Sequence, residues 1–200
     1  MSSDPPNSDD EKRRLHERRR RQRLLYSLND LQQARSACEF LYECDEDEKY
    51  SKIDLRRFRC YETTLVVAYT RPFSQSIGEI PALTMKMIDL RLSPERQAVH
   101  DQLIQMRNKI MAHSDAEMMR MTTEAYEVGL DAERPFYMMQ TVFDEGVTLL
   151  GQLLMDANTV LNEVHQAIVK SLYRDAQANP EQFNLRIDSA EARRARRMIE

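Results

Sequence analysis

The chain has 200 residues, of which 42% are hydrophobic and 31% charged, so it can bury a core and is typical of soluble globular proteins rather than disordered chains. Only four glycines and no tryptophan accompany abundant leucine, alanine, arginine, glutamate and methionine, a composition that favours helices over sheets. The net charge of −4 hides basic segments at residues 12–23 and 193–197, and no apolar run approaches the roughly 18 residues of a membrane span.

The three cysteines indicate a reducing compartment. Cys38, Cys44 and Cys60 are odd in number and lack the C-x-x-C spacing of many metal and redox sites. The N-terminus is acidic and proline-rich before it turns basic, which is not typical of a targeting peptide. We therefore expect a cytoplasmic protein with no membrane association.

Residues 1–23 are expected to form a disordered, basic N-terminal arm: residues 1–10 cannot bury anything and should be disordered, and the basic stretch that follows should extend the first helix into the solvent. Its Arg18–Arg21 run either binds RNA phosphates or forms a solvated surface. From residue 24, apolar side chains recur every three or four residues as far as Leu41 and predict the first core helix.

A second helix is expected from Ser51 to Arg71, where Pro72 ends it because the residue before a proline resists helical geometry. Arg71 is then either a charge at a helix end or a phosphate ligand. A loop over 74–81 and a short helical segment near 83–89 follow.

Ser93 and Pro94 predict the start of a third helix, with a hydroxyl cap and proline at the first helical position. His100 on this helix is either a second imidazole of a functional site or a helix-surface histidine. The helix is expected to close within residues 106–115, which hold the most informative side chains of the chain.

Residues 106–115 combine groups suited to phosphodiester chemistry. The imidazole of His113 can exchange protons near neutral pH, and Arg107 presents a permanently charged fork of donors to a phosphate. Cations also stabilise helix C-termini, so on these residues alone a helix end is the preferred interpretation. On an ideal helix Arg107 and His113 lie about 120° apart. They converge only if the helix unwinds or if a second subunit supplies one of them.

Arg107-Asn108, followed by four residues and His113, resembles the R-(polar)-x4-H signature of the HEPN superfamily. These are small helical bundles, many of them RNases of toxin–antitoxin, abortive-infection and other defence systems. The continuation through Ser114 is similar to the abortive-infection branch, as is the upstream segment 69–73. HEPN toxins with a nucleotidyltransferase antitoxin carry a modified tyrosine two residues after the histidine, where this chain departs from the pattern with Asp115.

The resemblance implies a metal-independent endoribonuclease, of toxin or phage-defence type, that needs no cofactor. His113 would be the general base on the RNA 2′-hydroxyl, Arg107 would hold the phosphate, and Asn108 would orient His113 or a phosphate oxygen. Arg71 and Lys109 would contact the substrate. RNA, a second copy of the chain in a homodimer, and an antitoxin or defence-system protein are the implied partners.

Alternating polar and apolar residues predict a small hairpin within 117–143. A fourth helix with a heptad rhythm follows as far as Ile168, capped by Thr141 with Asp144. Residues 175–200 are expected to form a polar, basic tail with a short helix near 188–197.

Together these patterns predict an all-α fold: an antiparallel four-helix bundle over residues 24–174, with a small β-hairpin appendage and basic terminal helical extensions. A metal-independent HEPN-type endoribonuclease is the first functional hypothesis. The alternative is a non-catalytic HEPN-like module that binds a protein or nucleic-acid partner, in which the Arg–His pair is structural.

Overall fold

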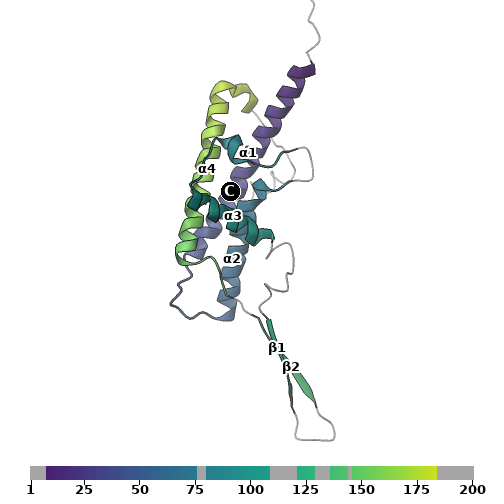
Figure 1. Ribbon diagram of the computed structural model, residues 1–200, viewed down its shortest axis with the longest axis vertical. Coiled ribbons are helices and arrows are strands. Elements are labelled where there is room, and N and C mark those ends of the chain that lie inside the picture. Colours follow the sequence, from purple (N-terminus) through teal and green to yellow (C-terminus); the bar gives the residue numbers. More distant parts are fainter. Residues whose placement is uncertain (1–7, 76–79, 109–120, 129–135, 144–145, 184–200) are drawn as a thin grey trace, which may run out of the picture.

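The computed structural model describes residues 8–75, 80–108, 121–128, 136–143 and 146–183. Within these ranges the chain is mostly helical, with a two-stranded antiparallel sheet, so the predicted helical fold with a small hairpin is confirmed (Figure 1). The elements in chain order are α1 (Ser8–Leu41), α2 (Lys52–Thr70), η1 (Arg71–Phe73), η2 (Met85–Ile88), α3 (Pro94–Met106), β1 (Met121–Glu127), β2 (Tyr137–Phe143), α4 (Gly151–Ala178) and η4 (Pro180–Phe183).

Helix α1 is the longest element and packs against α2 and α4. Near the start of α1, Arg20 Nη1 lies 2.5 Å from Asp175 Oδ2, close to the end of α4. Just after α1 ends, Tyr42 Oη accepts a 3.1 Å hydrogen bond from Asn158, near the start of α4. These two contacts show that α1 and α4 run antiparallel.

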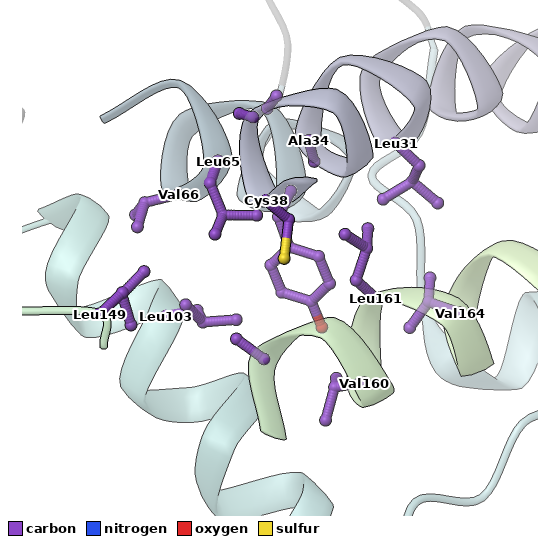
Figure 2. Close-up of a cluster of buried hydrophobic side chains, with 14 of the residues drawn as sticks. Leu31, Ala34, Cys38, Leu65, Val66, Leu103, Leu149, Val160, Leu161 and Val164 are labelled. Carbon is purple, nitrogen blue, oxygen red and sulfur yellow. The ribbon is translucent and has the colours of Figure 1, made fainter. Parts of the chain in front are cut away.

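The core lies where the apolar stripes of the helices meet (Figure 2). Helix α4 contributes most to it, because its heptad rhythm turns one face inward over five turns. Burying each such side chain contributes about 1.5–3 kcal/mol, so the stripe holds α4 in place. The fully buried side chains include Leu24, Leu31, Cys38, Leu41, Phe58, Leu65, Tyr69, Leu103, Leu149, Leu161, Val164 and Ile168.

The basic segment is part of α1, and the domain boundary expected at residue 24 falls inside this helix. Arg20 bonds to Asp175, as described above, and Arg21 Nη2 donates to Gln182 Oε1 at 2.7 Å. Arg23 Nε donates to the carbonyl of Pro81 at 2.6 Å. These three side chains therefore hold other segments against α1 instead of standing free for RNA.

Two helix starts follow the expected capping chemistry. Ser51 Oγ accepts the N–H of Asp54 at 3.2 Å at the start of α2, and Ser93 Oγ accepts the N–H of Arg96 at 3.3 Å at the start of α3. A serine oxygen at this position satisfies one of the free backbone donors of a helix N-terminus. The predicted starts of these two helices are confirmed.

The predicted cap of the fourth helix is wrong. Thr141 lies in β2, and α4 begins at Gly151 without a side-chain cap of its own. Instead Glu62 of α2 accepts the N–H groups of Thr148 and Leu149, each at 2.7 Å, and so holds the turn just before α4. A contact supplied by another helix has no local sequence signal, which is why the pattern misplaced the start of α4.

Gly151 is required by this junction. Its φ of +49° lies in the left-handed region that favours glycine. A Cβ at this position would also meet the carboxylate of Glu46, from the loop between α1 and α2. Because Glu46 is exposed and its carboxylate ends a flexible side chain that can move aside, the positive φ is the main reason for glycine at this position.

The hairpin extends away from the helices (Figure 1). Its register runs from Met121 opposite Phe143 to Glu127 opposite Tyr137. The side chains of residues 122–128 and 136–140 are all exposed. None of the described helices combines the length and the apolar character that a membrane crossing needs.

The hydrogen bonds from Thr148 and Leu149 to Glu62 give the first testable prediction. Burial raises the pKa of Glu62, although its hydrogen bonds to Leu149 and Thr148 oppose the rise. The folded chain thus binds the Glu62 proton more tightly than the unfolded chain does. This residue therefore contributes less stability as the pH rises above the ordinary glutamate pKa. Glu62→Gln keeps an acceptor oxygen without the buried charge.

We expect Glu62→Gln to gain stability relative to the wild type as the pH rises through the glutamate range. Glu62→Ala should instead lose roughly 1–3 kcal/mol, because the buried Leu149 donor loses its partner. Urea unfolding followed by circular dichroism at several pH values measures both differences. A Gln-minus-wild-type difference that does not change with pH would contradict this account.

Candidate functional site

The motif residues that the structure describes lie where α3 ends. Helix α3 runs to Met106, and Arg107 caps it with right-handed helical backbone angles and an N–H bonded to the carbonyls of Leu103 and Ile104. The motif therefore begins where α3 ends.

Arg107 and Asn108 contact each other. Arg107 Nη1 donates to Asn108 Oδ1 at 3.1 Å, Arg107 is half-buried and Asn108 is exposed. The preceding Leu103 and Met106 are buried in the core. Arg107 is thus held at the edge of the core, with its guanidinium partly open to solvent.

The other two motif residues named from the sequence, Lys109 and His113, lie outside the described residues. So do Ser114 and Asp115, and the basic run at 193–197. The site that the structure describes is therefore the Arg107–Asn108 pair and the side chains that support α3.

His100 supports α3 from the buried side. Its Nδ1 lies 2.7 Å from Tyr69 Oη, and its ring makes an edge-on contact with Phe73, with centroids 4.7 Å apart. Tyr69 is fully buried and His100 is only 9% exposed. The interpretation of His100 as a helix-surface histidine is wrong, because the tyrosine hydroxyl and the phenylalanine ring enclose it.

This environment disfavours a charged imidazole. Burial lowers the pKa of His100, and the carboxylate of Asp101 only partly offsets the effect. Burial likewise raises the pKa of Tyr69 far above its ordinary value, so its hydroxyl stays protonated. A neutral His100 can accept a hydrogen bond at Nδ1 from the Tyr69 hydroxyl. This bond makes the pair a structural link between α2 and α3.

Arg71 ends α2 and pairs with α1. Its Nη1 lies 2.7 Å from Asp30 Oδ1, and Asp30 is only 6% exposed. The arginine therefore pairs with a carboxylate that has little contact with solvent. The side chain of Arg71 remains 54% exposed. One nitrogen is therefore occupied by Asp30, while the rest of the guanidinium faces the solvent at the helix end.

The Tyr69–Phe73 segment unites these features. The rings of Tyr69 and Phe73 both contact the ring of His100, while Arg71 between them bonds to Asp30 of α1. Sequence reasoning named Arg71 but missed the tyrosine–histidine link. The sequence did place Tyr69 on the inward face of α2 and His100 about two turns before Arg107 on α3, and these two positions were the available signal.

Among the described residues, no group of three or more His, Cys, Asp or Glu side chains is placed to hold a metal ion. The surface grooves formed by described residues include one of about 440 Å³ between α1 and α2 and one of about 830 Å³ beside α4. The first is lined by neutral side chains such as Gln32, Gln33 and Tyr61, and Arg107 lines neither groove.

The buried imidazole predicts a pH effect on stability. The folded chain resists protonation of His100, so the wild type should lose stability as the pH falls below the ordinary histidine pKa, where only the unfolded chain takes up the proton readily. His100→Phe should be less stable at about pH 8, because the Tyr69 hydroxyl loses its partner, but should lose less stability on acidification.

Urea unfolding between about pH 8 and about pH 5.5 tests this prediction. His16→Phe is the matched control, because His16 is exposed on α1 and should leave the pH dependence of the wild type unchanged. A His100→Phe variant with the same loss on acidification as the wild type would contradict the assignment of His100 as a buried, neutral link.

In comparisons with family models, with curated proteins and with solved structures, the chain gave no match. The functional interpretation therefore depends on the chain's own residues and on the motif that they form.

Proposed function

We propose that this protein is a metal-independent endoribonuclease of the HEPN type. The observation that best supports the proposal is the position of Arg107 where the R-N-x4-H motif begins. Arg107 is half-buried at the end of α3, and its guanidinium donates to Asn108.

The angle between the two catalytic groups bears on how the site is built. In an α-helix, the six residues from Arg107 to His113 separate the two side chains by about 120°. The two groups converge either because the chain leaves the helix before His113 or because a second subunit supplies one of them, and mixing the two inactive variants distinguishes these arrangements.

In the proposed reaction, His113 accepts the proton of an RNA 2′-hydroxyl. The freed oxygen bonds to the adjacent phosphorus, the bond from phosphorus to the 5′-oxygen breaks, and that leaving oxygen takes up a proton. The products are a 2′,3′-cyclic phosphate and a 5′-hydroxyl. Arg107 stabilises the extra negative charge on the phosphoryl oxygens in the transition state. The Asn108 carbonyl, which accepts from Arg107, fixes the direction of the guanidinium.

Two further cations belong to the proposed substrate surface. Arg71 keeps more than half of its side chain exposed although one nitrogen bonds to Asp30, so its remaining donors can meet a phosphate. Lys109 follows the Arg107–Asn108 pair directly in the chain. Arg20, Arg21 and Arg23 are left out of this surface because they bond to the protein itself.

The HEPN assignment carries a wider proposal. It places the chain in the cytoplasm as an RNA-cleaving toxin or abortive-infection effector in antiviral defence, restrained by an antitoxin or another defence-system protein. It also includes the antiparallel four-helix bundle arrangement and a homodimer. The antiparallel contact between α1 and α4 supports the bundle arrangement, and the free thiols Cys38, Cys44 and Cys60 are compatible with a reducing compartment. The defence role, the antitoxin and the homodimer follow from the motif alone.

A non-catalytic binding module is the second candidate. The exposed hairpin supports it, because Phe136, Tyr137 and Met139 are each more than 60% exposed and are typical of interaction surfaces. In this case Arg107 would be structural, and replacing His113 would leave partner binding unchanged.

RNA cleavage in excess EDTA tests the first candidate. We expect the wild type to cut single-stranded RNA and to leave DNA intact, because DNA lacks the attacking hydroxyl. Arg107→Ala and His113→Ala should each slow cleavage by at least about 100-fold while retaining the wild-type circular dichroism spectrum. Arg91→Ala is the matched control: it removes an exposed arginine just before α3 and should cut at the wild-type rate.

If Arg107→Ala, His113→Ala and Arg91→Ala all cleave like the wild type, the activity lies elsewhere. A wild type that binds RNA without cutting any of several RNAs would favour the binding module.

Mixing the two inactive variants tests whether one chain holds the whole site. If Arg107 and His113 act within one chain, a mixture of Arg107→Ala and His113→Ala, unfolded and refolded together, should stay inactive. If the groups come from two subunits, mixed dimers regain one intact site, and the rate should rise to a substantial fraction of that of the wild type.

A further inference from the structure

Strand β2 presents an open edge of unusual composition. None of the residues 136–143 is charged, and Phe136, Tyr137 and Met139 are 62%, 62% and 72% exposed. Among the described elements, the hairpin has its main contacts only within itself, between β1 and β2. A two-stranded hairpin that packs on nothing is marginally stable in water, and an uncharged open strand is a template for further pairing.

The hydrogen-bonding phase shows which groups of β2 face this edge. Val128 donates its N–H to the carbonyl of Phe136 at 2.6 Å, so these two residues form a bonded pair. Bonded pairs alternate along an antiparallel ladder, so Gln140 is bonded to its partner Glu124. The N–H and C=O groups of Tyr137, Met139 and Thr141, which alternate with them, therefore point to the open side of β2.

We propose that β2 pairs with β2 of a second copy of this chain, antiparallel across a two-fold axis at Gln140, to make a four-stranded sheet. This axis overlaps the two strands over their whole length. It sets Met139 opposite Thr141 and Met138 opposite Val142 of the other copy. Met139 and Thr141 are both residues whose backbone groups face the edge, so hydrogen-bonding phase and symmetry agree.

Charge selects β2 and a second copy of it. Two antiparallel β2 strands bring no like charges together, whereas the β1 edge carries Glu124 and Glu127 and would repel itself. The exposed apolar side chains of one β2 strand would also lie opposite uncharged side chains of the other. The edge is thus complementary to itself in hydrogen bonding and in polarity, with no charge that would select a different, charged partner.

The contact is separate from the proposed catalytic site. Antiparallel pairing places the Phe143 ends of the two strands at opposite ends of the sheet, about 20 Å apart, because seven residues span six rises of about 3.4 Å. The two motif stretches are therefore not brought together by it. The inference does not depend on nuclease activity, and it can fail or hold independently of the proposed function.

A cysteine at the axis tests the pairing directly. In a Cys44→Ser, Cys60→Ser background, Gln140→Cys would place two thiols in a non-bonded pair with Cα atoms about 4.5 Å apart, within the range for a disulfide. We expect a covalent dimer under mild oxidation. Thr122→Cys, on β1 and just as exposed to solvent, is the matched control and should stay monomeric on a denaturing gel.

Light scattering over a concentration series gives the second readout. The wild type and Thr122→Lys should be dimers, and Gln140→Lys, which sets two lysines opposite each other at the axis, should shift to monomer. A monomeric wild type without a Gln140→Cys crosslink would overturn the proposal and leave β2 to a strand of another protein. A dimer that survives Gln140→Lys would also overturn it and would point to a contact elsewhere, such as a shared catalytic site.

Discussion

The hydrogen bond between Tyr69 and His100 is the constraint on which the site depends. It joins the end of α2 to the middle of α3 inside the core, and the edge-on ring of Phe73 closes it from the solvent. Because Tyr69 is fully buried, a displaced α3 would leave its hydroxyl without a partner, at a cost of about 1–3 kcal/mol. The position of α3, and with it that of Arg107 about two turns further on, is fixed by this pair.

A rigid support matters for the chemistry proposed here. Electrostatic stabilisation of a phosphoryl transition state requires a cation whose direction is set before the reaction. Arg107 meets this requirement through the buried turn before it and through its bond to Asn108, while its partial exposure leaves room for a phosphate. Folding of the helices, and not binding of the RNA, therefore supplies the free energy that orders the arginine side chain.

Sequence patterns predicted the elements whose signals are local. Ser93 marked its helix start as a cap, and alternation along β1 with aromatic and β-branched residues along β2 predicted the hairpin, because such signals are properties of a few neighbouring residues. The start of α4 and the burial of His100 were mispredicted because Glu62 and Tyr69, which hold these places, come from a distant helix. Arg107 was found from its motif, but its half-buried position and its bond to Asn108 leave no pattern in the residue types.

The same distinction separates the two parts of the functional proposal. Residue types and spacing suggested an RNase, whereas the fold adds the half-buried position of Arg107 and its bond to Asn108. The most direct test is the chemical nature of the product. With an oligodeoxynucleotide that contains a single ribonucleotide, mass spectrometry should show cleavage only after the ribonucleotide, leaving a 2′,3′-cyclic phosphate and a 5′-hydroxyl. A 5′-phosphate with a 3′-hydroxyl, or cleavage at the deoxynucleotides, would contradict attack by the 2′-hydroxyl and with it the central claim.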